Sequence, residues 1–257
     1  MKHIKKKYIF EKEIKAKSFE SLEFVDVKDI HNDTLKKVGK TNNIILQTTE
    51  DENIFAFIYN RNGKHIPVPL PDFTLVYYDF AYRLNVWRKD YEKEMFKKLS
   101  DITLFSELSS QDVYYFYGYS TSCIINLFTS IECFINYLIP ENGEFKEVKN
   151  NRTEIYNKTQ IQDCIPFMDK LKKVLPQFHD NKNFFLHSTP TNNHIIKLKE
   201  LRDSIIHTKS DKTGEIAIEL FKKIIKFEYD QTLLSVAKLM NFYEPNYIED
   251  CPCGVEF

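Results

Sequence analysis

A chain of 257 residues, 42% of them hydrophobic, is long enough to bury one large core, or a helical domain with a smaller appendage. Its 36 basic and 37 acidic residues nearly cancel, so no overall field attracts nucleic acid or an anionic membrane, and any such contact must be local. Only six glycines occur, and neither common glycine-rich phosphate-binding motif is present, which argues against a nucleotide-binding loop.

The five cysteines indicate a reducing compartment, because their number is odd, they lie in apolar surroundings and no secretory signal peptide precedes them. The longest apolar run, residues 133–139, is interrupted by Asn136 and is too short to span a bilayer. We therefore expect a cytoplasmic protein that does not enter a membrane.

The first seventy or so residues predict a small β-rich segment. Short runs of β-branched and aromatic residues separated by polar turns are typical of strands. These runs cover residues 7–14, 22–27, 43–48 and 54–59. Residues 49–53 predict a hairpin turn and Asn62-Gly63 a second turn. Prolines at 67, 69 and 71 are expected to end regular pairing, which places a domain boundary near residue 72.

Helical periodicity begins at residue 73 and predicts a mainly α domain over residues 73–245, followed by a flexible tail over 246–257. The expected helices cover residues 73–99, 113–139, 161–175, 194–209 and 215–243. The second is apolar on nearly every side, as in a central buried helix, so its few polar residues are of interest. Residues 141–160 are expected to form a long polar loop.

The expected helix over 194–209 carries Arg202 and His207. Helical phase places Arg202 inside an apolar arc, whereas His207 lies roughly 140° further around the helix. A guanidinium that faces a core needs a partner, and Glu132 and Asn136, one turn apart on the central helix, are the candidates. We therefore expect Arg202 within salt-bridge or hydrogen-bond reach of Glu132 or Asn136. Breaking such a buried pair typically costs about 3 to 5 kcal/mol.

The segment Arg202-Asp203-Ser204-Ile205-Ile206-His207 resembles the R-x4-6-H signature of HEPN-domain proteins. This all-helical, dimer-forming class includes many metal-independent endoribonucleases of toxin and phage-defence systems. Asp203 fits the polar residue that usually follows the arginine in that family. Glu132 and Asn136 look like the polar pair that many members carry on the facing helix. The resemblance covers at most residues 76–245.

Arginine and histidine together supply the chemistry that metal-free cleavage of a phosphodiester needs. Arginine offers a bidentate fork to phosphate oxygens, and histidine, with an unperturbed pKa of about 6.5, takes or gives a proton. The resemblance implies that Arg202, Asp203 and His207 are catalytic, that Glu132 and Asn136 support them, and that no metal or cofactor is required. It further implies RNA as substrate, cleavage to a 2′,3′-cyclic phosphate, a homodimer cleft, and an antitoxin or trigger as a partner.

Surrounding residues add to this hypothesis. Four lysines predict a local basic patch in the dimer: Lys197, Lys199, Lys209 and Lys212. The aromatic run over residues 114–119 can stack on unpaired bases, although such runs more often fill a helical core.

A structural interpretation stands beside the catalytic one. Arg202 can hold two helices together through an ion pair, and His207 is favoured near a helix C-terminus by the helix dipole. Glu132 and Asn136 can belong to an internal hydrogen-bond network. Several HEPN-like modules are non-catalytic, so a dimerisation or ligand-binding module is the alternative function.

Overall fold

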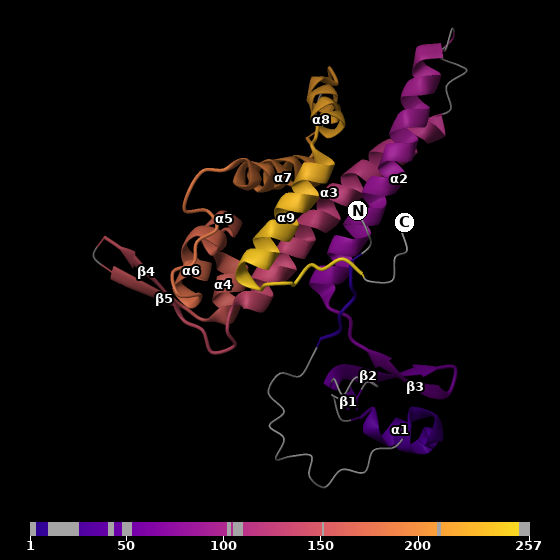
Figure 1. Ribbon diagram of the computed structural model, residues 1–257, viewed down its shortest axis with the longest axis vertical. Coiled ribbons are helices and arrows are strands. Elements are labelled where there is room, and N and C mark those ends of the chain that lie inside the picture. The colour runs from indigo at the N-terminus through magenta and orange to yellow at the C-terminus, as the bar shows by residue number, and fades with distance from the viewer. Residues whose placement is uncertain are drawn as a thin grey trace. The chain divides into compact units, whose positions relative to one another are not determined.

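The computed structural model describes residues 4–9, 26–40, 44–47, 53–101, 104, 110–150, 152–209 and 212–251. It divides the chain into two compact units (Figure 1). One unit is residues 6–72, and the other joins residues 73–257 with the first five residues. The division falls beside the boundary near residue 72 that the sequence indicates.

The N-terminal unit contains a three-stranded antiparallel sheet in the order β1 (Ile44–Gln47), β2 (Asn53–Arg61) and β3 (Lys64–Pro69). The predicted turn at Asn62-Gly63 is confirmed, since both residues have the positive φ that a tight hairpin turn requires. Helix α1 (Asn32–Val38) contacts β2 and β3.

The N-terminal unit differs from the sequence-based prediction in its prolines, in helix α1 and at Val27. The prolines do not stop pairing, because β3 is an edge strand and Pro67 and Pro69 pair with Ile58 and Ala56 of β2. Helix α1 was not expected. Val27, the last residue of one expected strand, begins a 3-10 turn instead. The rest of that strand, the end of the first one and the turn over 49–52 lie outside the described residues.

In the second unit, the mainly α prediction is confirmed. Helices α2 (Phe73–Asp101) and α3 (Ser110–Leu138) lie side by side, with α9 (Tyr229–Tyr243) alongside them (Figure 1). Helix α3 is central, as expected from its apolar sequence. Its fully buried side chains include Phe116, Ile124, Ile131, Phe134 and Ile135. None of the described helices is both long and apolar enough to cross a membrane.

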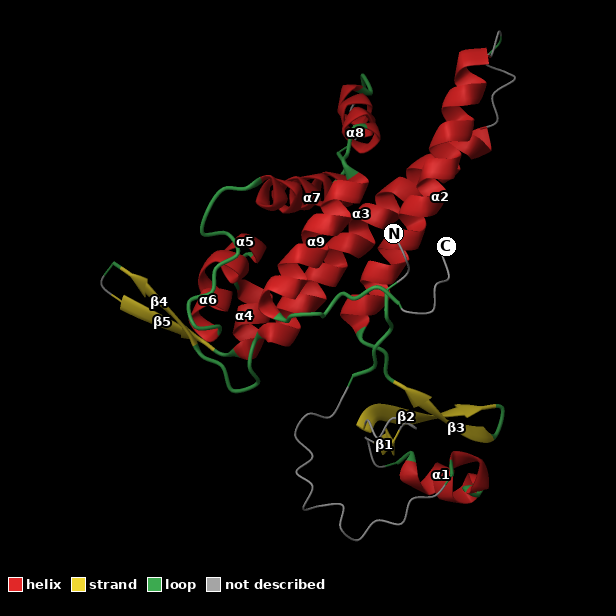
Figure 2. Cartoon of the chain, viewed as in Figure 1, coloured by secondary structure: helices red, strands yellow, loops and turns green. Residues whose placement is uncertain are grey.

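The prediction of a loop over residues 141–160 is wrong, because this segment contains a β-hairpin of β4 (Phe145–Lys149) and β5 (Arg152–Tyr156). The hairpin projects from the helices and exposes much of both faces, so its strands lack the apolar alternation that marks a half-buried strand (Figure 2). Cross-strand charges hold it instead, with Lys149 Nζ 2.7 Å from Glu154 Oε2.

The expected helix over 161–175 is interrupted. It consists of α4 (Lys158–Cys164), α5 (Phe167–Asp169), a π-helical segment (Lys170–Val174) and α6 (Leu175–Phe178). Pro166 disfavours a helical conformation at Ile165, which is extended with ψ of 128°, so α4 ends there.

The expected final helix is also two helices, α8 (Glu215–Ile225) and α9, separated at residues 226–228. Tyr229 stabilises the bend, because its hydroxyl donates to the Ile224 carbonyl at 3.0 Å and its ring is buried. The change in direction brings α8 next to the C-terminal half of α7 (Pro190–Ile206).

The described part of the expected flexible tail is anchored. Tyr247 is buried against the Phe134 ring, with the two ring centroids 4.9 Å apart. The Asn241 amide donates to the Ile248 carbonyl and accepts from the Ile248 N–H. The tail prediction is therefore wrong for residues 246–251, and residues 252–257 lie outside the described part.

Candidate functional site

Helix α7 carries the candidate site and is fixed at both ends. Thr189 caps it by accepting from the Asn192 N–H, and Pro190 occupies the first turn, so the helix begins four residues before the expected start. It ends at Ile206 rather than at residue 209. His207 follows immediately and donates its backbone N–H to the Asp203 carbonyl at 2.9 Å.

Arg202 lies on the face of α7 that packs against α3, as helical phase predicts. Its Nη2 is 3.6 Å from Glu132 Oε2, and its Cζ lies 4.5 Å from the centre of the Phe128 ring. The predicted contact with Glu132 is therefore present. No hydrogen bond joins Arg202 to the half-buried Asn136 in the described part of the chain. The Arg202 side chain keeps 28% of its surface exposed, so a ligand can still reach it.

Asp203 holds the guanidinium from the same helix. It accepts from Arg202 Nη1 at 2.9 Å and from Lys199 Nζ at 2.6 Å. Burial alone would raise the pKa of Asp203, but the hydrogen bonds from Lys199 and Arg202 outweigh it and the pKa is lowered. The sequence interpretation missed Lys199 as a partner of Asp203, although their separation of four residues was the available signal.

The pKa of Glu132 shifts in the opposite direction to that of Asp203. Burial raises the pKa of its carboxyl, and the nearby positive charges of Arg202 and Lys170 offset this only in part. Burial also lowers the pKa of Lys170, whose ammonium donates to the Gln162 carbonyl at 2.6 Å. The site thus pairs a guanidinium with a carboxyl that binds a proton more readily than usual.

His207 is exposed and lies apart from the Arg202 contacts. Its side chain lines a shallow cavity with Ser204, Lys223 and other residues of α7 and α8. Among the residues that the structure describes, no hydrogen bond or ion pair links the His207 ring to Arg202. One subunit therefore does not join these two side chains into a single cluster.

The surrounding residues have mixed roles. Within the aromatic run, Phe116 is in the core, Tyr114 is 78% exposed, and Tyr115 and Tyr119 pack with rings of α2. Two lysines of the expected basic patch are neutralised within the chain, because Lys199 pairs with Asp203 and Lys197 with Glu228.

The described residues contain no group of three or more His, Cys, Asp or Glu side chains placed to hold a metal ion. A scan against protein-family models finds no match, and neither curated proteins nor solved structures show significant similarity to this chain. The interpretation of the site therefore depends on its own residues and their geometry.

The two carboxyls of the site should affect stability with opposite pH dependence. Glu132 has a folded-state pKa above its ordinary value of 4.5, so its contribution is favourable in acid and is lost as pH rises through the folded-state pKa. Asp203 has a folded-state pKa below its ordinary value of 3.8, so its contribution is present at neutral pH and is lost as pH falls through that pKa.

We therefore expect Asp203→Asn to lower the free energy of unfolding at neutral pH and to have little effect in strong acid. The wild type should lose some stability between acid and neutral pH as Glu132 ionises. Glu132→Gln cannot ionise there, so this loss should be absent in the variant. The Glu132 and Asp203 side chains are 41% and 34% exposed, so solvent screens their charges. Each substitution should therefore change the free energy of unfolding by less than about 1 kcal/mol, which is below the cost of breaking a buried pair. Urea unfolding across this pH range measures both, and parallel pH profiles for the two variants would contradict the assignment.

Proposed function

We propose that the protein is a metal-independent endoribonuclease that cleaves single-stranded or loop RNA, as the resemblance to HEPN-domain proteins implies. The observation that carries the proposal is the state of Arg202. Its guanidinium is oriented by Glu132, Asp203 and the Phe128 ring, yet it remains partly exposed, and the exposed His207 follows five residues later. Oriented, accessible donors are what stabilisation of a phosphate in the transition state requires.

In this mechanism the 2′-oxygen of a ribose attacks the adjacent phosphorus, and the bond from phosphorus to the 5′-oxygen breaks. One His207 imidazole accepts the 2′-hydroxyl proton, and the protonated imidazole of the second copy of His207 donates a proton to the departing 5′-oxygen. Arg202 stabilises the negative charge on the phosphate oxygens, and Asp203 and Glu132 orient Arg202. The products are a 2′,3′-cyclic phosphate and a 5′-hydroxyl end.

A homodimer is the most direct way to complete such a site. Arg202 faces α3 while His207 faces α8, so an Arg and a His are most easily brought together by two copies of α7 about a two-fold axis. Exposed isoleucines beside His207 supply apolar surface for this contact, with Ile206 51% and Ile216 44% exposed. We place the activity in the cytoplasm, in toxin or phage defence, with an antitoxin or trigger as its regulator.

The test is digestion of single-stranded RNA by the purified protein in the presence of EDTA. We expect cleavage by the wild type, with 2′,3′-cyclic phosphate ends, and none above background by His207→Ala. Equal cleavage by the two proteins would assign the activity elsewhere. Absence of cleavage by both would favour the alternative, a non-catalytic dimerisation or ligand-binding module in which Arg202 joins α7 to α3.

A further inference from the structure

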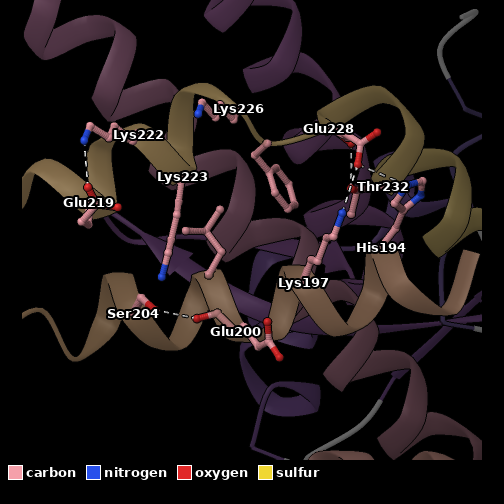
Figure 3. Close-up of a pocket in the computed structure, with 12 residues that line it drawn as sticks. His194, Lys197, Glu200, Ser204, Glu219, Lys222, Lys223, Lys226, Glu228 and Thr232 are labelled. Atoms are coloured by element: carbon pink, nitrogen blue, oxygen red, sulfur yellow. Dashed lines mark hydrogen bonds and ion pairs between the residues drawn. The ribbon is translucent and has the colours of Figure 1, made fainter. Parts of the chain in front are cut away.

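A cavity of about 320 Å³ lies between α7, α8 and the start of α9 (Figure 3). Leu201 and the half-buried Phe227 form part of its apolar lining, and charged side chains surround them. None of these residues belongs to the Arg202 contacts.

Four lysines and three glutamates line the cavity, and their pairing is uneven. Lys197 lies 3.4 Å from Glu228, and Lys222 lies 2.8 Å from Glu219. Among the described residues, no salt bridge joins Lys223, Lys226 or the third glutamate, Glu200, to an oppositely charged side chain. Lys223 and Lys226 still lie close enough to Glu219 for their charges to help lower its pKa. Figure 3 shows the Lys223 side chain extending from α8 toward Ser204 on α7. An ammonium that is not held in a salt bridge therefore faces a cavity with an apolar wall, which favours an anionic ligand with an apolar part.

This cavity adjoins the one that contains His207. Ser204, Glu219 and Lys223 line both cavities, so Lys223 stands where they meet. Together they follow α7 from His194 to His207, a distance of about 20 Å along the helix axis. That length accommodates several nucleotides of a single strand, far more than one phosphate ion.

Hydrogen bonds hold the side chains at the end of the groove farthest from His207. Ser235 donates its hydroxyl hydrogen to the Gln231 carbonyl, so its oxygen accepts from Nδ1 of His194 at 3.0 Å. The other ring nitrogen of His194 then faces Glu228 at 3.6 Å. Phe227 lines the same cavity and contacts the Tyr229 ring edge to face, with ring centroids 4.9 Å apart, and an unpaired base can stack on the side of its ring that faces the cavity.

We propose that this groove binds the single-stranded RNA substrate. Lys223 binds a backbone phosphate next to the one at His207, and Phe227 stacks against a base further along the strand. The inference rests on the proposed ribonuclease function, because it names the path by which the substrate reaches His207.

The test measures binding separately from cleavage. A fluorescent single-stranded RNA with every 2′-hydroxyl methylated cannot be cut by 2′-oxygen attack, and its affinity for the full-length protein is measured by anisotropy at several salt concentrations. We expect Lys223→Gln to bind more weakly and to reduce the slope of log affinity against log salt by about 0.7, the loss of one phosphate contact. Lys238→Gln is the matched control, because Lys238 is exposed on α9 and lines neither cavity.

Equal affinity and salt slope for the two lysine variants would overturn the inference, as would displacement of the RNA by inorganic phosphate at matched ionic strength. The outcome separates the two proposals. If RNA binding depends on Lys223 but the wild type does not cleave natural RNA, the proposed binding groove stands and the proposed ribonuclease activity is contradicted. If the wild type cleaves RNA but Lys223→Gln changes neither binding nor KM, the proposed ribonuclease activity stands and the proposed binding groove is contradicted.

Discussion

The His207→Ala variant is expected to lose RNA cleavage by about 10²- to 10⁴-fold, the usual contribution of a general acid or base. Its fold should be unaffected. The His207 side chain is exposed, and its hydrogen bond to Asp203 comes from the backbone N–H, which alanine retains. The change in the free energy of unfolding should therefore stay within about 0.5 kcal/mol, as for most exposed substitutions.

A matched control distinguishes the loss of proton transfer by His207 from the effect of removing any exposed histidine. His187 is also exposed and lies just before α7, so His187→Ala should cleave RNA at the wild-type rate. Single-turnover cleavage measures both variants, and urea unfolding checks their stability. If His187→Ala and His207→Ala lose the same activity, proton transfer by His207 is not the cause.

Arg202→Lys gives a second view of the same chemistry. Lysine keeps the positive charge near Glu132 but cannot donate the bidentate fork of arginine. A ribonuclease should therefore lose much of its rate in this variant, whereas a purely structural ion pair should tolerate it.

The contact between Arg202 and Glu132 was predictable because two strong local patterns meet there. Helix α3 is apolar almost all round, so its few polar residues stand out, and Arg202 sits inside the apolar arc of α7. Burial of Ile195, Leu198 and Leu201 fixes the rotation of α7, and the guanidinium must then face α3.

Other features depend on tertiary contacts that leave little trace in the sequence. The bend between α8 and α9 contains no proline or glycine, and it is held by burial of Tyr229 and its hydrogen bond to Ile224. Without that bend Lys223 would not face α7, so its position beside His207 could not be predicted. The β4 and β5 hairpin was missed for a related reason, because its charge pairs replace an apolar face.

Glu92→Ala is expected to lower the free energy of unfolding by about 3 kcal/mol, because it leaves a buried guanidinium without its charged partner. Arg88 of α2 is only 6% exposed, and its Nη1 lies 2.6 Å from Glu92 Oε2. Two further contacts hold Arg88: its Nε donates to Asn85 Oδ1 at 2.9 Å, and its Cζ lies 4.1 Å from the centre of the Tyr229 ring on α9. Neither supplies a full negative charge, and the Asp230 carboxylate, whose pKa Arg88 helps to lower, acts on Arg88 without a direct salt bridge.

The same network fixes α9 against α2, since the Asn85 amide donates to Asp230 Oδ1 at 2.7 Å. Glu94→Ala is the matched control, because Glu94 is exposed on the same helix and should change stability by less than about 0.5 kcal/mol. If the cost comes from the stranded charge, adding Arg88→Met to Glu92→Ala should recover part of the loss, in a double-mutant cycle followed by urea unfolding. Equal stability of the Glu92→Ala and Glu94→Ala variants would mean that Asn85 and the Tyr229 ring suffice to compensate the Arg88 charge.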